Sequence, residues 1–218
     1  MQQVTLPFLT EQVELAETLQ AGRDTMLEPR DLPGRYGRVV RAVERILQAT
    51  NIEAVLGGGW AVWRHGYSAR VTQDVDIALP ADRIEEFQRV ASVSGFQLLE
   101  SQPGRWPKMV HKDTGVQVDI LPEGAQPGRP GKLAPTTIPH PKSMGAEAGH
   151  LHYLSLPALI VLKIAAGRAR DESDVVELLR ANADEVANLR TYVAGVHGDY
   201  LLAFDRLAQQ AAEPASNN

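Results

Sequence analysis

The chain has no cysteine among its 218 residues. This absence excludes disulfide bonds, zinc sites with cysteine ligands and catalysis by a thiol. The chain also has no apolar run that approaches the roughly 20 residues of a membrane-spanning helix. Its first residues lack the basic start and apolar core of a secretory signal peptide. We therefore expect a cytoplasmic protein that does not act at a membrane.

An excess of positive charge is absent as well, because the net charge is −5. This balance argues against a broadly basic surface for nucleic acid. A local basic groove stays open, since Arg64, Arg70, Arg105 and Lys108 flank the acidic residues described below. The length allows one large domain or two small ones, and either can bury a core.

Hydrophobic periodicity predicts an α/β half followed by an all-helical end. The expected helices and strands, in chain order, are helices 9–26 and 35–49, strand 53–57, helix 59–66, strand 73–79, helix 83–93, strands 96–99, 106–111, 116–121 and 150–154, and helices from 156 to about 210. Asp82 is the expected N-cap of the helix over 83–93. Residues 122–149 are rich in proline and glycine, and we expect an irregular loop that is functional or mobile.

The expected organisation has four parts. They are N-terminal helices (1–50), an α/β core (51–155), a helical C-terminal subdomain (156–212) and a disordered tail (213–218). The fold class is α/β (α+β), with a small mixed β-sheet and packed helices.

Two aspartates lie one residue apart in the apolar segment 73–79. Side chains alternate along a strand, so Asp74 and Asp76 point to the same face, opposite Val75 and Ile77. Adjacent carboxylates repel each other and raise each other's pKa unless a positive charge lies between them. The pair therefore indicates a site for Mg²⁺ and substrate phosphates. A solvated Asp-x-Asp pair is the alternative, which the apolar flanks disfavour.

Three glycines precede this pair, at Gly57, Gly58 and Gly59. One alternative is that they simply form a tight turn with no role in binding. Followed by a helix, they would also let backbone N–H groups approach phosphate oxygens closely, and the helix dipole would favour the anion. Arg70 and Thr72 come just before the carboxylates and could contact phosphates as well.

The ordered combination resembles a known signature. Gly58-Gly59-Trp60-Ala61, His65-Gly66, Arg70, Thr72 and Asp74-Val75-Asp76-Ile77 are similar to the signature of the nucleotidyltransferase superfamily, the polymerase-beta-like fold. This form resembles most the minimal nucleotidyltransferases of the AbiEii and MenT toxin type, and more distantly the antibiotic nucleotidyltransferases. Gly59 replaces the serine of the classical Gly-Ser motif, which removes a hydroxyl from the phosphate site.

The resemblance implies a third acid on a strand beside the pair, and Val118-Asp119-Ile120 matches that element. An acid within a strand is costly unless it is paired or belongs to a site. Asp74, Asp76 and Asp119 would then hold two Mg²⁺ ions, with Mn²⁺ as a substitute, for in-line displacement at the α-phosphate of an NTP such as ATP. Asp119 would help to activate the acceptor hydroxyl, as metal ligand or base. An exposed Asp119 on an edge strand is the alternative.

A second similar motif follows in the helical end, where Lys163 precedes Arg168, Arg170, Asp171 and Asp174. Lys163 lies in an apolar helix, where an unpaired ammonium is costly. It could reach the triphosphate or a site carboxylate, or instead reach solvent or pair with Asp171 or Asp174. Asp171 could also act only as the N-cap of a helix over 172–181.

Other polar and aromatic residues carry weaker predictions. We expect His65 to pack at a helix end, and Trp60 and Trp63 to lie in the core. Trp106 is a weak candidate for contact with substrate. A zinc site could be formed by three histidines, but their spacing is not that of a known set of zinc ligands. They are His140, His150 and His152.

The predicted function is metal-dependent transfer of an NMP from an NTP to an acceptor hydroxyl. The acceptor could be tRNA, a protein or a small molecule, and the toxin-type resemblance implies a cognate antitoxin as a partner. The alternatives are an antibiotic nucleotidyltransferase and a non-catalytic nucleotide-binding or partner-binding protein with this fold.

Overall fold

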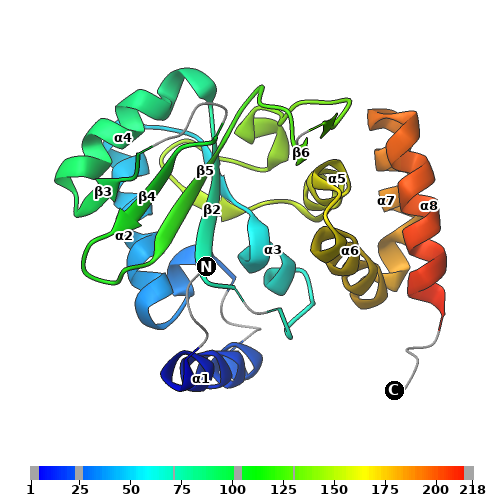
Figure 1. The fold of residues 1–218 in the computed structure, drawn as a ribbon, viewed down its shortest axis with the longest axis horizontal. Coiled ribbons are helices and arrows are strands. Elements are labelled where there is room, and N and C mark those ends of the chain that lie inside the picture. Colours follow the sequence, from blue (N-terminus) through cyan, green and yellow to red (C-terminus); the bar gives the residue numbers. More distant parts are fainter. Residues whose placement is uncertain (1–4, 23–26, 71, 101–104, 130, 214–218) are drawn as a thin grey trace.

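The computed structural model describes residues 5–22, 27–70, 72–100, 105–129 and 131–213, and its helices surround one mixed sheet (Figure 1). The α-helices are α1 (Leu6–Gly22), α2 (Gly34–Thr50), α3 (Gly58–Arg64), α4 (Ile84–Val93), α5 (Leu156–Ala166), α6 (Ala169–Ala181), α7 (Val186–Val196) and α8 (Gly198–Ala212). The strands of the main sheet are β1 (Ala54–Leu56), β2 (Asp74–Leu79), β3 (Phe96–Leu98), β4 (Lys108–His111), β5 (Gln117–Pro122) and β8 (Leu151–Tyr153).

The sheet has the order β3-β4-β5-β2-β1-β8. β2 and β5 are parallel neighbours at its centre, and β1 and β8 also run parallel. The other neighbouring pairs are antiparallel, including the β4–β5 hairpin, which turns at Asp113-Thr114-Gly115. The predicted mixed sheet and helical end therefore agree with the structure.

The two faces of the sheet belong to two separate apolar clusters. Val75, Ile77 and Leu79 of β2 pack into a cluster with α2 and α4, which also holds Trp60 and Trp63. Ala78 of β2 packs into a second cluster, together with α5–α8. In Figure 1, α5 and α6 lie between the sheet and the outer pair α7 and α8. The carboxylates of β2 share the side of Ala78, so they face the helical C-terminal part.

Three local predictions need correction. The first helix begins at Leu6, and residues 23–26 of the expected range lie outside the described residues. Asp82 is not the N-cap of α4, because it lies within a 3-10 turn (Ala81–Arg83) that runs directly into the helix. The segment 122–149 is not wholly irregular, since it contains a small hairpin of β6 (Gly128–Arg129) and β7 (Lys132–Leu133) and a 3-10 turn (Pro141–Met144). Of the expected tail, only Glu213 lies within the described residues.

No described helix is both long enough and apolar enough to span a membrane.

Candidate active site

Strand β2 presents Asp74 and Asp76 on one face, because its side chains alternate. Both are half-buried, whereas Val75 and Ile77 on the opposite face are fully buried. Trp60 of α3 donates an indole N–H to the carbonyl of Asp74 at 3.0 Å, which ties the helix to the strand beside the acids. The local sequence thus places two carboxylates on a rigid central strand.

Parallel pairing with β5 brings the third acid alongside. Asp119 lies directly opposite Asp76 in the register of the two strands, and Val118 and Ile120 lie opposite Val75 and Ile77. The position predicted for Asp119, on a strand beside the pair, is the observed one. The alternative, an exposed Asp119 on an edge strand, is wrong because β5 lies between β4 and β2.

The three acids leave an electrostatic imbalance at Asp76. Burial, together with the neighbouring charges of Asp74 and Asp119, raises the pKa of Asp76 to about 7, although Lys163 and Arg168 act in the opposite direction. A carboxyl that holds its proton near neutrality has too little positive charge around it. A bound divalent cation would supply that charge, and carboxylate oxygens are the ligands that Mg²⁺ prefers.

Asp119 already has two partners on the sheet. Lys108 of β4 lies opposite it in register and donates to its Oδ2 at 2.5 Å, while Gln117 donates to its Oδ1 at 2.6 Å. Within the described residues, no three His, Asp or Glu side chains converge as a metal site. Metal binding by Asp74, Asp76 and Asp119 therefore stays a prediction, and Lys108 competes with a cation for the carboxylate of Asp119.

The glycines are required by close packing around the acids. A Cβ atom on Gly58 would lie 1.7 Å from Oδ2 of Asp76, and its φ of +57° is left-handed. A Cβ on Gly59 would lie 2.5 Å from Oγ1 of Thr72, whose hydroxyl lies 3.3 Å from Oδ1 of Asp74. The glycines thus make room for the carboxylates and for Thr72. Phosphate binding by this turn stays a prediction, and the dipole of α3 adds little to it because the helix has only seven residues.

Gly58→Ala is expected to destabilise the protein by about 2–3 kcal/mol, from left-handed strain and overpacking. Displacement of the Asp76 carboxylate should also reduce activity. Gly34→Ala is the matched control, because Gly34 has a φ of +60° and open space around its Cβ position. Chemical denaturation of both variants separates the cost of left-handed strain, which both variants share, from the cost of overpacking against Asp76. Equal losses of stability would show that Gly58 is needed only for its backbone conformation.

Lys163 of α5 is buried in an ion-pair cluster rather than extended to solvent. Its ammonium donates to Asp171 Oδ1 at 2.9 Å and to Asp174 Oδ2 at 2.7 Å, both on α6. Burial tends to raise the pKa of Asp171, but the charge of Lys163 and hydrogen bonds from Arg168 and Lys163 hold it below its ordinary value. The pairing expected as the structural alternative is therefore present. A direct role of Lys163 with nucleotide stays a prediction, supported by its effect on Asp76.

Arg70 belongs to the same cluster. Its Nε donates to Asp174 Oδ1 at 2.8 Å, and both side chains are nearly buried. Asp171 is not an N-cap, because α6 begins at Ala169 and Asp171 lies in its first turn. The cluster therefore joins α5 and α6 to the segment that leads into β2.

Arg168 is a candidate site residue to which the sequence analysis assigned no role of its own. It donates to Asp171 at 2.6 Å, its side chain is 67 % exposed, and its charge acts on Asp76. Its place in the Lys163-to-Asp174 motif was the available signal. Lys108 was noted only as a flanking cation, because pairing with Asp119 depends on a strand register that the sequence does not specify.

The four cations that leave a local basic groove open are compensated only in part. Arg70 pairs with Asp174 and Lys108 pairs with Asp119, so two of the four charges are compensated. Arg64 donates to the carbonyl of Leu27 at 3.4 Å. Arg105 is exposed.

The weaker predictions can also be placed. His65 packs at the end of α3, 2.7 Å from the carbonyl of Leu154, and burial lowers its pKa. Trp60 and Trp63 are core residues as predicted, and Trp106 packs partly against the second cluster. The histidines face carboxylates in the pairs His140–Glu53, His150–Glu44, His152–Glu28 and His152–Glu147.

Part of the chain, which includes the three aspartates, is similar to one enzyme family. A model of the family aminoglycoside-2''-adenylyltransferase matches residues 39–127, less than half of the chain. The match includes Gly58, Gly59 and all three aspartates, and it ends before Lys163. It supports the nucleotidyltransferase superfamily, whereas the AbiEii and MenT resemblance is not specifically shown. A comparison with curated proteins found no match.

Similar solved structures include two of one enzyme. The crystal structure of ANT(2'')-Ia in complex with adenylyl-2''-tobramycin has 15% identity and a TM-score of 0.41, and the match covers 80% of this chain and 98% of that one. The solution structure of the antibiotic-resistance factor ANT(2'')-Ia has 16% identity and a TM-score of 0.39, covering 79% and 89%. JHP933 from Helicobacter pylori has 15% identity and a TM-score of 0.35, covering 80% and 89%. TM-scores this low carry no functional conclusion.

Proposed function

We propose that this chain, which the family match supports as a nucleotidyltransferase, transfers AMP from ATP to a hydroxyl group of an aminoglycoside. The observation that carries the proposal is the set of three aspartates on register-paired central strands, inside the region that matches the aminoglycoside-2''-adenylyltransferase family. This acceptor replaces the toxin-type acceptors as the leading hypothesis, because nothing in the fold or the family match favours tRNA, a protein acceptor or an antitoxin.

The residues divide the proposed reaction among them. Asp74 and Asp76 would hold Mg²⁺, and Asp119 would join them on release from Lys108. Bound Mg²⁺ would neutralise the charge that develops on the phosphate oxygens during displacement. The acceptor oxygen forms a bond to the α-phosphorus as the bond to pyrophosphate breaks, and the hydroxyl proton passes to a carboxylate oxygen. Asp119, released from Lys108, would help to activate that hydroxyl as metal ligand or base.

The site also supplies cations for the phosphates. Arg168 is the exposed cation that acts on Asp76, and its guanidinium suits bidentate contact with phosphate oxygens. Three further residues would act on the nucleotide through the aspartates that they contact. Arg70 and Lys163 contact Asp174, and Thr72 contacts Asp74.

The test is transfer of label from each of the four NTPs in the presence of Mg²⁺. The acceptors offered are tobramycin, a panel of other aminoglycosides, tRNA and total cell protein. ATP-dependent labelling of an aminoglycoside, with release of pyrophosphate, is the expected result. Labelling of tRNA or protein alone would overturn the proposed acceptor and restore the toxin hypothesis. NTP binding without transfer to any acceptor would indicate a non-catalytic binding protein.

A further inference from the structure

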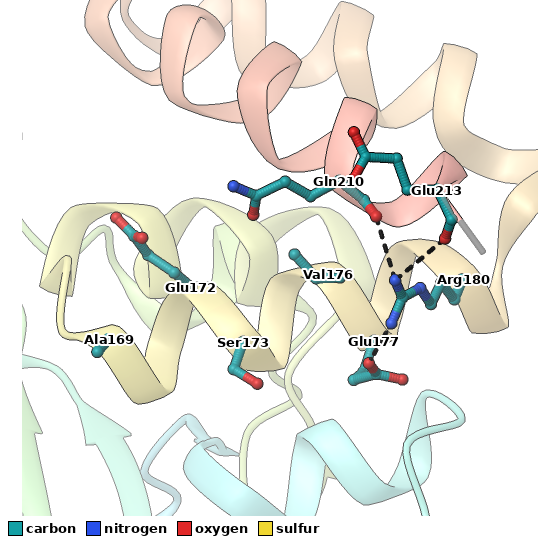
Figure 2. Close-up of a pocket in the computed structure, with 8 residues that line it drawn as sticks. All are labelled: Ala169, Glu172, Ser173, Val176, Glu177, Arg180, Gln210 and Glu213. Carbon is teal, nitrogen blue, oxygen red and sulfur yellow. Dashed lines mark hydrogen bonds and ion pairs between the residues drawn. The ribbon is translucent and has the colours of Figure 1, made fainter. Parts of the chain in front are cut away.

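Two surface hollows lie away from the three aspartates. The first, of about 430 Å³, runs between α6 and the end of α8, and its lining includes Glu172, Glu177, Arg180 and Gln210 (Figure 2). Arg180 donates to the carbonyls of Gln210 and Glu213 and pairs with Glu177 (Figure 2). Glu172 pairs with Arg206. These contacts hold the last turn of α8 against α6, so this hollow is explained by the docking of two helices.

The second hollow, of about 450 Å³, lies on the opposite side of the sheet from the carboxylates. It is lined by Arg38, Arg41, Glu44, Arg45, His111 and Asp113. His111 ends β4 on the face of Met109, which belongs to the cluster with α2 and α4. Lys108 lies on the other face, where it meets Asp119. The hollow therefore opens between α2 and the β4–β5 turn, separate from the candidate active site.

Three arginines line this hollow from a single helix face. Arg38, Arg41 and Arg45 occupy positions i, i+3 and i+7 of α2, which follow one another along one side of a helix. Arg41 donates to the backbone carbonyls of Arg30 and Leu32, and neutral carbonyls leave its charge uncompensated. Within the described residues, the side chains of Arg38 and Arg45 have no hydrogen bond or ion pair. The three arginines therefore form a local group of positive charge with no ion pair among the described residues, in a chain of net charge −5.

The rest of the lining adds a polar floor. His111 is buried, and its Nδ1 lies 3.0 Å from the hydroxyl of Thr114. Burial, with the charges of Arg38 and Arg45, lowers the pKa of His111, so its ring is neutral at pH 7. Glu44 is mostly buried and lies 4.0 Å from His150, and Asp113 is exposed. The two acids therefore compensate the three arginines only in part.

We propose that the hollow formed by Arg38, Arg41, Arg45 and His111 binds a compact phosphate-bearing ligand. The guanidinium fork matches phosphate oxygens, and three arginines suit a dianion better than a single carboxylate. The volume is that of a small-molecule site rather than of a groove for a polymer. The ligand is a free phosphate ion or a phosphomonoester. The hollow of Figure 2 offers no equivalent, because the arginine that lines it, Arg180, is paired with Glu177. This second site does not depend on the proposed transferase activity.

The test uses the whole chain in EDTA, so that binding through metal ions at the aspartates does not contribute. Inorganic phosphate, AMP and citrate are titrated at constant ionic strength, and amide chemical shifts locate the bound ion. The variant is Arg38→Ala/Arg45→Ala. The control is Arg89→Ala/Lys132→Ala, which removes the same charge from two other exposed positions.

The expected result is phosphate binding that shifts amides of α2 and of residues 111–115. The affinity should fall at least tenfold in Arg38→Ala/Arg45→Ala and stay within twofold of wild type in the control. Preference for AMP would identify a phosphomonoester site, and equal binding of inorganic phosphate would identify recognition of the phosphate group alone. Either result supports the proposal. Four results would overturn it. Citrate binds and both phosphates do not, or the shifts map to β2 and β5. Both double variants lose affinity equally, or neither phosphate binds when its concentration is 10-fold that of the added chloride.

Discussion

Asp76→Asn is expected to reduce nucleotide transfer by about 10³-fold or more in kcat/KM, as removal of a catalytic group commonly does. The same change should stabilise the ion-free protein at pH 8. The two effects have one cause, since Asp76 is half-buried between Asp74 and Asp119 and is forced to carry charge above its raised pKa. Asparagine keeps the shape and removes the charge.

The pH dependence follows from the direction of the shift. The pKa of Asp76 is about 7 in the folded protein, against 3.8 as its ordinary value. Between these values the folded state keeps a proton that the unfolded state releases, so the contribution of Asp76 to stability is present at low pH and is lost as pH rises through 7. Each pKa unit corresponds to about 1.4 kcal/mol of unfolding free energy, and partial exposure of Asp76 reduces the sum. We therefore expect the free energy of unfolding to differ by about 1–2 kcal/mol between low and high pH.

Urea denaturation in EDTA at pH 5 and pH 8 measures this effect. Asp76→Asn should be more stable than wild type at pH 8, and the difference should be clearly smaller at pH 5. Added Mg²⁺ should stabilise the wild type and leave the variant unchanged. Asp82→Asn, the same change at an exposed position, is the control. A variant that is less stable than wild type at pH 8 would contradict the electrostatic account, and one with full activity would remove Asp76 from the mechanism.

Lys163→Met is expected to lower the free energy of unfolding by about 3–5 kcal/mol, because it leaves buried carboxylates without their cation. Asp171 loses a partner at 2.9 Å and Asp174 loses one at 2.7 Å. Methionine is close to lysine in volume, so the loss reports charge rather than a cavity. Lys142→Met, at an exposed lysine, is the control and should cost less than about 0.5 kcal/mol.

A second variant separates a structural role of Lys163 from a role with nucleotide. Lys163→Met/Asp171→Asn removes one charge of each sign and leaves Asp174 paired with Arg70, so it should recover much of the stability. If Lys163 contacts nucleotide, KM for ATP should remain raised after stability returns. Recovery of both properties together would show that Lys163 acts only in packing. A single variant as stable as wild type would contradict the reported ion pairs.

The sequence predicted the parts of the site that depend on local pattern. Alternation in 73–79 placed Asp74 and Asp76 on one face, and the apolar flanks correctly indicated a buried strand. The prediction that Trp60 and Trp63, on the short helix, lie in the core is also confirmed. Local pattern suffices for Asp74 and Asp76 because strand alternation is set by the backbone itself.

Long-range partners were not predictable in the same way. Lys108 meets Asp119 through antiparallel register, and Arg70 meets Asp174 across 104 residues of sequence. Register and helix docking depend on the whole core rather than on a local motif. The prediction for Gly58 was also incomplete, because the atom nearest to its missing Cβ position belongs to Asp76, on another element.

The ion pair between Arg70 and Asp174 also limits how the molecule can move. Together with the hydrogen bond from Asn182 to the carbonyl of His65, at 2.7 Å, it fastens the middle and the C-terminal end of α6 to the connection between α3 and β2. Opening this joint would separate a buried ion pair, so we expect conformers with the joint open to be rare. A substrate that reaches the aspartates should therefore enter without a swing of α6, and exchange of the amides at this joint should be among the slowest in the C-terminal helices.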